Sequence, residues 1–512
     1  MDVSADVVIV GFGAAGACAA IEAARSGASV VVLDRFAGGG ATALSGGVVY
    51  AGGGTRQQVE AGVPDTPEGM FEYLRHEVGD AVSPETLWRF CRDSAEMLRW
   101  LEERGVPFDA SLCPFKTSYP TNDYYLYHSG SEQARRDVAP PAARGHRAKG
   151  RGTSGALLFA RLAGSARGHG VRVLPQTAAV ELITENGRVT GVRCRTLTGS
   201  PRIAHRVLSR FAVKPGLYYP PLGRSLHRRA AALERRHGRE LLVRANRGVV
   251  IAAGGFVFNR ELMREHAPAY RGGLPLGTPG DDGSGIRLGT EVGGTTARMD
   301  RVSAWRFITP PSALRKGVLV GVDGRRVCDE SLYGAAIGEA IVTGHGGRAW
   351  LLVDDWVVRE ARGQVPSQTL LFQRLQARYL LSRGLVTGLT IEEVAAKAGI
   401  DAVGLKATAR AYGHLPDALG KLPELVRPLT PPYSLIDVSV RSRVGYPCPV
   451  LTLGGLVVDE DTGRVTGVHG LYAAGRSAVG VCSQSYVSGL SLADCVFSGR
   501  RAGLHAAEEA PC

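Results

Sequence analysis

The sequence has no apolar run of the ~18 residues that a membrane-spanning helix requires. Its first residues, MDVSADVVIVGFGAAG, also lack the basic region, apolar stretch and cleavage site of a secretory signal. Internal repeats and low-complexity segments are missing as well. We therefore expect a globular protein of the cytoplasm.

Paired cysteine motifs are also missing. The nine cysteines are scattered, with no C-x-x-C pair and no C-x-x-C-H sequence for attaching haem. An odd, unpatterned set of cysteines is typical of reduced thiols. No cluster of His and Cys has the spacing of a zinc site, so we expect no metal site.

Acidic residues are scarce in one segment, which holds most of the net charge of +13. Between Arg195 and Arg247 there are thirteen Lys and Arg residues and only two acids, Glu234 and Glu240. We call residues 195–247 the basic insert. No recognition motif for nucleic acid accompanies it, so we expect no nucleic acid partner.

Glycine, in contrast, is abundant, with 68 residues, and the first glycines follow a buried strand. The apolar run Ala5–Val10 predicts that strand, the alanine-rich stretch up to Gly27 predicts a helix, and Ala28–Asp34 predicts a second strand. Gly11, Gly13 and Gly16 form G-x-G-x-x-G between strand and helix, and Asp34 ends the next strand. This arrangement predicts a dinucleotide whose pyrophosphate faces the helix N-terminus and whose ribose binds Asp34.

The rest of the chain predicts an α/β protein with two domains. Helices are expected between about residues 66 and 105, and residues 171–193 read as strand, strand, Asn-Gly turn and strand, which predicts a meander. Residues 259–440 have a different sequence pattern, with helical stretches and no further strand–helix–strand unit. We expect a nucleotide domain of residues 1–258 and 441–512 that contains the basic insert, and a substrate domain of residues 259–440.

The dinucleotide is expected to be FAD. Gly38–Gly47 (GGGATALSGG) follows the ribose acid, and Gly470–Arg476 (GLYAAGR) lies near the other end of the chain. Segments from both ends therefore contribute to one extended site, which suits FAD better than NAD.

These motifs, together with VVIAAGGF, GDDGSGI and TLGGLVVD, resemble the fumarate reductase/3-ketosteroid dehydrogenase family of flavoproteins, in the family's order over nearly the whole chain. The resemblance implies a discontinuous Rossmann-like FAD-binding domain with an inserted α+β substrate (capping) domain. Where the family attaches flavin covalently, a histidine lies near the SGG segment. Here Ala43–Gly47 contains none, so we expect non-covalent FAD.

The glycine motifs and the resemblance assign a set of residues to the cofactor site. They are Gly11, Gly13, Ala14, Ala15, Gly16, Asp34, Arg35, Gly40, Ala41, Thr42, Ser45, Gly46, Gly47, Ala178, Ala253, Gly254, Gly475, Arg476, Gly489, Leu490, Ser491 and Leu492. Gly489, Leu490 and Ser491 are expected to point free N–H groups at the flavin from the start of the last helix.

The tripeptide Tyr486-Val487-Ser488 before Gly489 is similar to that of the 3-ketosteroid Δ4-(5α)-dehydrogenases. That likeness implies desaturation of 3-keto-5α-steroids between C4 and C5, with the proton taken by Tyr486 and the hydride by flavin N5. Tyr333 from the second domain would support the base, and Ser488 would assist by hydrogen bonding. Because a phenol has a pKa near 10, Tyr486 would need neighbours that lower it.

Several of these residues could instead have a purely structural role. Tyr486 and Ser488 could be an ordinary loop tyrosine and a helix cap, and Tyr333 could be packing. A tyrosine cluster could line an apolar pocket or simply pack: Tyr119, Tyr124, Tyr125 and Tyr127. His146 and Arg147 could bind phosphate or substrate, but we expect a solvated basic turn.

The basic insert could dock on an anionic membrane. Tyr218, Tyr219 and Leu222 precede an amphipathic helix that carries Arg228, Arg229, Arg235, Arg236 and Arg239. A solvated helix or a subunit contact is the alternative.

Three other functions remain open at this point. One is 3-ketosteroid Δ1-dehydrogenation, and the second is reduction of an unsaturated acid, as in fumarate or urocanate reduction, for which Arg301 and Arg306 could clamp carboxylates. The third is an electron-carrying flavoprotein subunit. As partners we expect a polycyclic ketone and an electron acceptor, either a quinone or an electron-transfer protein.

Overall fold

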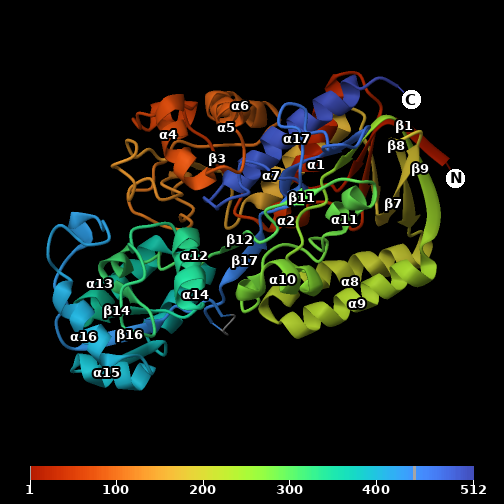
Figure 1. The fold of residues 1–512 in the computed structure, drawn as a ribbon. Helices are drawn as coiled ribbons and strands as arrows, with labels where there is room; N and C mark the ends of the chain where they lie inside the picture. Colours follow the sequence, from red (N-terminus) through yellow and green to blue (C-terminus); the bar gives the residue numbers. More distant parts are fainter. Residues whose placement is uncertain (1, 442–444, 512) are drawn as a thin grey trace.

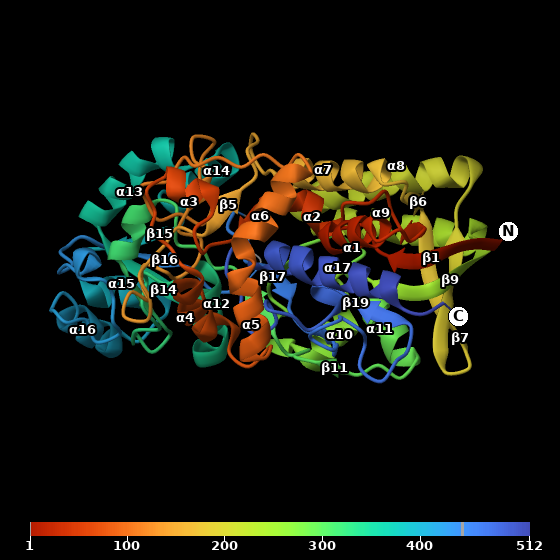
Figure 2. The same ribbon diagram turned by 90° about the horizontal axis from the view of Figure 1, so that it is seen from above.

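The computed structural model describes residues 2–441 and 445–511, with the side chains of residues 2, 214–218 and 220 left aside. Figures 1 and 2 show two parts next to each other. One part is a large sheet with helices packed on it, formed by both ends of the chain. The other is a smaller part of strands and helices formed by the middle of the chain.

The large part is built on a sheet in the order β6-β2-β1-β9-β8-β7, with β19 also paired to β9. β1 lies in its centre and is parallel to β2 and β9. Alternate residues of β1 enter two different apolar cores, Val7 and Ile9 one of them and Val8 and Val10 the other. The strands are β1 (Asp2–Val10), β2 (Val30–Asp34), β6 (Arg172–Pro175), β7 (Thr177–Glu185), β8 (Arg188–Thr196), β9 (Arg239–Ile251) and β19 (Leu471–Ala473).

The first and last helices of the chain pack together, which joins the two ends into one domain. α1 (Ala14–Arg25) contacts α17 (Leu490–Glu508) and α7 (Gly155–Gly168). A Cβ on Gly499 or Gly503 of α17 would collide with backbone carbonyls of α1, so these glycines permit the close approach. α1 ends as predicted, with Gly27 at φ +82° after the cap residue.

The strands predicted for residues 171–193 are present, but they do not form the predicted meander with one another. β6 pairs in parallel with β2, whereas β7 and β8 form an antiparallel hairpin that continues into the first half of β9. The meander is thus β7-β8-β9. The local pattern cannot reveal this, because strand partners are chosen by tertiary packing.

The basic insert forms a helical hairpin between β8 and β9. Its helices are α8 (Gly199–Tyr218) and α9 (Pro220–His237). In both views they run alongside each other at one edge of the large part (Figures 1 and 2). Among the described residues, no helix is both long and apolar enough to cross a bilayer.

Smaller elements complete the fold. The predicted helices between residues 66 and 105 are confirmed as α4 (Pro67–Val78), α5 (Pro84–Arg92) and α6 (Ser94–Glu103). A three-stranded sheet joins β3 (Val48–Tyr50), β5 (Gly145–Arg147) and β4 (Leu126–Tyr127), and a second joins β10 (Leu274–Pro275), β17 (Pro449–Thr452) and β12 (Val302–Ala304). Other short elements are α2 (Gly40–Leu44), α3 (Arg56–Glu60), α10 (Arg260–His266), α11 (Ser284–Glu291), β11 (Thr296–Ala297) and β18 (Gly455–Leu456).

The smaller part has its own four-stranded antiparallel sheet in the order β13-β14-β16-β15. Its elements are β13 (Val318–Val320), α12 (Gly334–His345), β14 (Trp350–Asp354), α13 (Asp355–Gln368), α14 (Leu371–Leu380), β15 (Leu385–Gly388), α15 (Ile391–Ala398), α16 (Ala402–Ala411) and β16 (Tyr433–Asp437). α11, which precedes this sheet, contacts β7 and β9 of the large part. We therefore propose that the inserted domain begins near β12 rather than at residue 259.

Candidate active site

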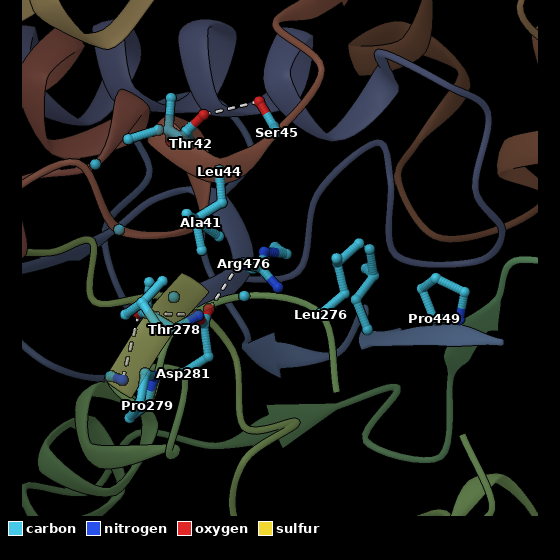
Figure 3. Close-up of a pocket in the computed structure, with 18 of the residues that line it drawn as sticks. Ala41, Thr42, Leu44, Ser45, Leu276, Thr278, Pro279, Asp281, Pro449 and Arg476 are labelled. Atoms are coloured by element: carbon cyan, nitrogen blue, oxygen red, sulfur yellow. Dashed lines mark hydrogen bonds and ion pairs between the residues drawn. The ribbon is translucent and has the colours of Figure 1, made fainter. Parts of the chain in front are cut away.

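One long cavity of about 2120 Å³ runs between the two parts. A pocket for one drug-sized ligand measures about 300–1,000 Å³, so this cavity has room for a cofactor and a second molecule. Figure 3 shows Ala41 and Thr42 of α2 on one side and Thr278 and Asp281 on the other, with Arg476 between them. Leu276 and Pro449 lie farther along the same cavity (Figure 3).

The three glycines after β1 have three different surroundings. Gly11 has φ +104°, and a Cβ there would meet the backbone of Ala252. A Cβ on Gly16 would meet the carbonyl of Gly11, so this glycine lets helix and strand pack closely. Gly13 lines the cavity, and the nearest atom that a Cβ there would meet is Thr42 Oγ1, at 3.5 Å. The space beside Gly13 at the start of α1 therefore fits a pyrophosphate.

Asp34 lies at the end of β2 on the cavity wall. Its carboxylate accepts the N–H groups of Phe12 (3.0 Å), Phe36 (2.8 Å) and Gly38 (3.0 Å). Burial raises the pKa of Asp34, while these three N–H groups act in the opposite direction. The acid therefore holds the turn and the loop after β2 together, and its contact with ribose stays a proposal.

Arg35, expected to contact the cofactor, lines the cavity but is already bound to two acids. Its guanidinium donates to both oxygens of Glu234 on α9, with Nε–Oε1 at 3.0 Å, and to Asp282 at 2.7 Å. His205 of α8 also hydrogen-bonds Glu234 (2.9 Å), and its ring stacks on Phe36 at 5.8 Å. The basic insert is thus fastened beside Asp34, where several of its residues line the cavity.

Most of the residues assigned to the cofactor site meet on this one cavity. The residues that line it are Gly11, Gly13, Ala14, Ala15, Asp34, Arg35, Gly40, Ala41, Thr42, Ser45, Gly46, Gly47, Ala178, Ala253, Gly254, Gly475, Arg476, Gly489, Ser491 and Leu492. The Thr42 hydroxyl also accepts the N–H of Ala14 (3.0 Å), which ties α2 to the start of α1.

Leu490 departs from the expectation for the start of α17. Its side chain is fully buried, and its N–H donates to the carbonyl of Val487 at 3.0 Å. It has no free N–H to offer, because Val487–Leu490 forms a tight turn. Ser491 and Leu492, in the first turn of α17, line the cavity instead.

Arg476 supplies a positive charge to the cofactor half of the cavity. One of its NH2 groups donates to Asp281 at 2.6 Å. The other, Nη1, is buried without a hydrogen-bond partner among the described residues. A buried donor that faces a cavity is normally satisfied by a ligand or water. This donor, the open side of Gly13 and the cavity volume fit FAD.

Tyr486, Ser488 and Tyr333 come from two distant segments and line the same cavity. Tyr486 and Ser488 lie on the loop before α17, and Tyr333 caps the N-terminus of α12. The ring centroids of Tyr333 and Tyr486 are 6.4 Å apart, and the ring planes are inclined by 30°.

The pKa of Tyr486 does not follow the expectation. Burial raises it above the ordinary phenol value, while the Gly489 N–H and the charge of Arg476 pull it down only in part. The pKa of Tyr333 is raised as well, first by burial and then by the neighbouring tyrosines. In this apolar site the phenols are therefore held neutral.

Two aromatic residues that were not expected from the sequence complete the site. Trp305, just after β12, packs on Tyr486 at 4.8 Å, and Phe307 packs on Tyr333 at 5.4 Å. The Trp305 Nε1 is buried without a hydrogen-bond partner in the described part of the chain. In the sequence, the pattern that could have indicated these two residues is the alternation of Trp305 and Phe307 directly after a strand.

The tyrosine cluster divides between the two expected roles. The hydroxyl of Tyr127 lies 3.1 Å from Ser488 Oγ, so Tyr127 supports the site. Tyr119 lines the cavity and donates to the carbonyl of Gly46 at 2.7 Å. Tyr124 packs on Phe115, and Tyr125 donates to the carbonyl of Gly150 at 3.4 Å.

The expectation of a solvated basic turn at His146 and Arg147 is wrong, because both side chains are buried in β5. His146 bonds Thr55 Oγ1 at 2.8 Å, and burial lowers its pKa to about 4. Arg147 donates to backbone carbonyls, such as that of Thr121, and stacks on Tyr119. Both residues hold the loops behind the cavity together.

The arginines that would clamp a carboxylate point elsewhere. Arg306 is buried, donates to the carbonyl of Ser439 at 2.8 Å and stacks on Tyr446. Arg301 lies 3.6 Å from Glu339. Neither lines the cavity. Within residues 2–441 and 445–511 there is also no cluster of three or more His, Cys, Asp or Glu residues suited to a metal ion.

Comparison with known proteins identifies the family of the chain. Residues 6–489 match the FAD binding domain family. The chain is 40% identical over 502 residues to 3-oxo-5-alpha-steroid 4-dehydrogenase of Comamonas testosteroni, covering 92% of each chain. It is 27% identical to 3-oxosteroid 1-dehydrogenase of Mycobacterium tuberculosis, covering 99% of this chain and 98% of that protein.

A solved structure extends the likeness to the fold. The crystal structure of 3-ketosteroid Δ4-(5α)-dehydrogenase from Rhodococcus jostii RHA1, in complex with 4-androstene-3,17-dione, superposes with a TM-score of 0.82 at 32% identity, covering 99% of this chain and 97% of that one. The expected fold, a FAD-binding domain with a second domain inserted, is thus confirmed. The cradle at Gly13, the donors at Arg476 and the match over nearly the whole chain lead to one conclusion: this chain belongs to the FAD binding domain family of FAD-dependent oxidoreductases.

Proposed function

We propose that the protein dehydrogenates 3-keto-5α-steroids between C4 and C5. The observation that carries the proposal is the group of hydroxyls at one end of the cavity. Tyr486, Tyr333 and Ser488 face the cavity there, with aromatic rings around them. The likeness to a steroid 4-dehydrogenase at 40% identity supports the same reaction.

The walls of this end suit a flat apolar ketone. Trp305 and Phe307 offer aromatic faces, and Leu276 and Pro449 add aliphatic surface. Aromatic and aliphatic walls with a few convergent polar groups are typical of sites for such ligands. The hydroxyls are then the groups that orient the ketone.

The reaction removes a proton from C4, next to the ketone, and a hydride from C5. Bound FAD supplies the hydride acceptor. We propose that Tyr486 takes the proton at its hydroxyl oxygen and that Tyr333 and Ser488 hold that oxygen in place. Because burial raises the pKa of Tyr486, the hydroxyl first loses its own proton to solvent, and its small ionised fraction then takes the C4 proton.

The other functions are less well supported. A carboxylate substrate calls for arginines near the hydroxyls, and Arg301 and Arg306 are bound elsewhere. An electron carrier needs no shaped cavity beside its cofactor, whereas this cavity continues beyond the cofactor residues to the tyrosines. Dehydrogenation at C1–C2 stays the close alternative, because the same hydroxyls could serve it.

The test is anaerobic bleaching of the flavin absorbance by two steroids. 5α-Androstane-3,17-dione has saturated C4–C5 and C1–C2 bonds, whereas 4-androstene-3,17-dione has only C1–C2 left to oxidise. We expect bleaching by the first and none by the second. Bleaching by both would establish the Δ1 reaction instead, and bleaching by neither would refute the steroid assignment.

The role of Tyr486 is tested in the same assay. Tyr486→Phe removes the hydroxyl and should slow flavin reduction at least ~100-fold, the order contributed by a general base. Tyr124→Phe is the matched control, because Tyr124 packs on Phe115 and does not line the cavity. If both variants reduce flavin at the wild-type rate, Tyr486 is not the base.

The electron acceptor belongs to the proposal as well. A quinone or an electron-transfer protein would reoxidise the flavin, and a cytoplasmic location would suit either. Reoxidation of the bleached enzyme by a soluble quinone analogue, followed at the flavin absorbance, tests the first. Contact with a membrane is a separate question, for which the exposed apolar side chains are informative.

A further inference from the structure

Exposed apolar side chains gather on a few helices. Of the sixteen large apolar side chains that are exposed in the described part of the chain, nine lie on α8, the start of α9 and α14. They are Ile203, Val207, Phe211, Tyr219, Leu222, Leu371, Phe372, Leu375 and Tyr379. This concentration on three helices sets them apart from apolar side chains scattered singly over a surface.

The side chains form one row on each of α8 and α14. Ile203, Val207 and Phe211 are spaced by four residues along α8 and are 49–65% exposed. Leu371, Leu375 and Tyr379 repeat this spacing along α14 and are 42–71% exposed. Residues four apart lie on the same face of a helix. The opposite faces are buried, with His205 on α8 and Ala377 on α14, so the rows are additional to the core.

Both helices border the same cavity. Tyr219 and Pro221 from the turn of the basic insert line it, and so do Phe372, Leu375 and Tyr379 of α14. Because several of these residues are also exposed, they mark its opening to solvent. In the view from above, α14 and the α8–α9 hairpin lie along the same edge of the molecule (Figure 2). We call the nine side chains the rim face.

The charge beside the rim face has one sign. α8 carries Arg202, Arg206 and Arg210 and no acid, and residues 369–391 carry Arg374, Arg378 and Arg383 and no acid. Glu234 of α9 is bound to Arg35 and His205. α10, whose residues also line the cavity, is balanced, with Glu261 and Glu265 against Arg260 and Arg264.

We propose that the rim face docks on an anionic lipid surface. Helices with an apolar row flanked by arginines lie in the interface of such membranes, with the apolar row among the acyl chains. A second copy of the chain suits the face less well, because it would bring two basic surfaces together. The proposal differs from the sequence expectation, since the exposed rows lie on α8 and α14, and Tyr218 lies outside the side chains described.

The position of the rim face has a consequence for the proposed function, on which this step rests. A steroid dissolved in the bilayer would reach the cavity opening without crossing water. Transfer of so apolar a molecule through water is costly. Docking would therefore raise the rate with membrane-borne substrate and leave the rate with water-borne substrate unchanged.

The experiment uses the FAD-loaded full chain and vesicles of phosphatidylcholine, alone or mixed equally with phosphatidylglycerol. The rim variant combines Ile203→Gln, Phe211→Gln and Leu371→Gln, none of which lines the cavity. The control variant combines Leu389→Gln, Val403→Gln and Leu415→Gln, which are similarly exposed but lie in the part away from the cavity. Sedimentation measures binding to the vesicles.

We expect wild type and control to bind the mixed vesicles alike and the rim variant to bind at least ~10-fold more weakly. Binding to phosphatidylcholine alone should be weaker for all three, by about fivefold for each arginine that contacts lipid. Equal binding by rim and control variants would overturn the proposal, and so would a wild-type dimer in light scattering that only the rim variant abolishes. If vesicles bind as expected but no steroid bleaches the flavin, the docking stands and the proposed function fails.

Discussion

The fastening of the basic insert over the Asp34 end of the cavity depends on one carboxylate, so Glu234→Gln is the most informative single change. Gln has the size of Glu but no charge. In the native protein both Glu234 oxygens accept from Arg35, at 3.0 and 2.9 Å, and one also bonds His205 at 2.9 Å. The side chain of Glu234 is only 15% exposed.

Two independent estimates of the free energy of the Glu234–Arg35 interaction agree. Burial alone would raise the pKa of Glu234, but hydrogen bonds from His205 and Arg35 lower it to about 2. Relative to the ordinary value near 4.5, that shift corresponds to roughly 3 kcal/mol. Hydrogen bonds to charged groups contribute about 1.5–3 kcal/mol each, of which Gln keeps a part. We therefore expect Glu234→Gln to weaken docking of the insert by about 2–3 kcal/mol.

The assay is titration of the apoprotein with FAD, followed by flavin fluorescence. If the insert covers the adenosine of FAD, the loss appears as a dissociation constant roughly 30- to 150-fold higher. Trypsin should also cut the arginine-rich hairpin faster. Glu240→Gln is the matched control, because Glu240 is the other acid of the insert and is exposed.

The pH dependence gives a second readout. Because the folded pKa of Glu234 is lowered, its stabilisation is fully present above about pH 4.5 and is lost as the pH falls toward 2. FAD affinity of the wild type should fall over that window, whereas Glu234→Gln should change less. Equal FAD affinity and equal trypsin sensitivity of the Glu234→Gln and Glu240→Gln variants would refute the reasoning.

Three further predictions concern the cavity and its surroundings. Because the pKa of Tyr486 is raised, the fraction of its ionised, basic form increases about tenfold per pH unit below that pKa. The rate of flavin reduction, measured by stopped flow, should therefore rise from about pH 7 to 9. A plateau in that rate below about pH 8 would contradict this prediction. Asp494 is buried, and burial raises its pKa to about 6. Its charge therefore destabilises the fold as the pH rises through about 4 to 6. In calorimetry, Asp494→Asn should increase the free energy of unfolding by about 1–3 kcal/mol at about pH 8 and leave it unchanged at about pH 4. Gly13→Val should leave the fold intact but abolish FAD binding in gel filtration, since a side chain there meets the cavity, whereas Gly16→Val should fail to fold.

The cofactor could be predicted from sequence because its signal is local. Gly11, Gly13, Gly16 and Asp34 occupy fixed places along one strand–helix–strand unit, and each place has one backbone requirement. The length of α1 and its end at Gly27 follow from the same short stretch. Family likeness then added Tyr486 and Ser488, which lie next to a recognisable helix start.

The surroundings of those residues could not be read from the chain. Trp305 and Tyr486 come from different parts of the sequence, and Tyr127 reaches Ser488 from 361 positions away. Arg147 looks like a surface arginine in sequence, yet four backbone carbonyls and two aromatic rings hold it inside. Sequence pattern reports polarity, whereas burial depends on which partners satisfy each polar group.

The sequence by itself determined the βαβ unit, the cofactor class and the basic character of residues 195–247, because each depends on neighbours along the chain. The tertiary structure alone decided which helix of the insert exposes its apolar row, which acid fastens it and whether the Tyr486 phenol is ionised. Those properties depend on desolvation and on contacts between distant segments. A pKa or an exposed surface exists only once the chain has folded around it.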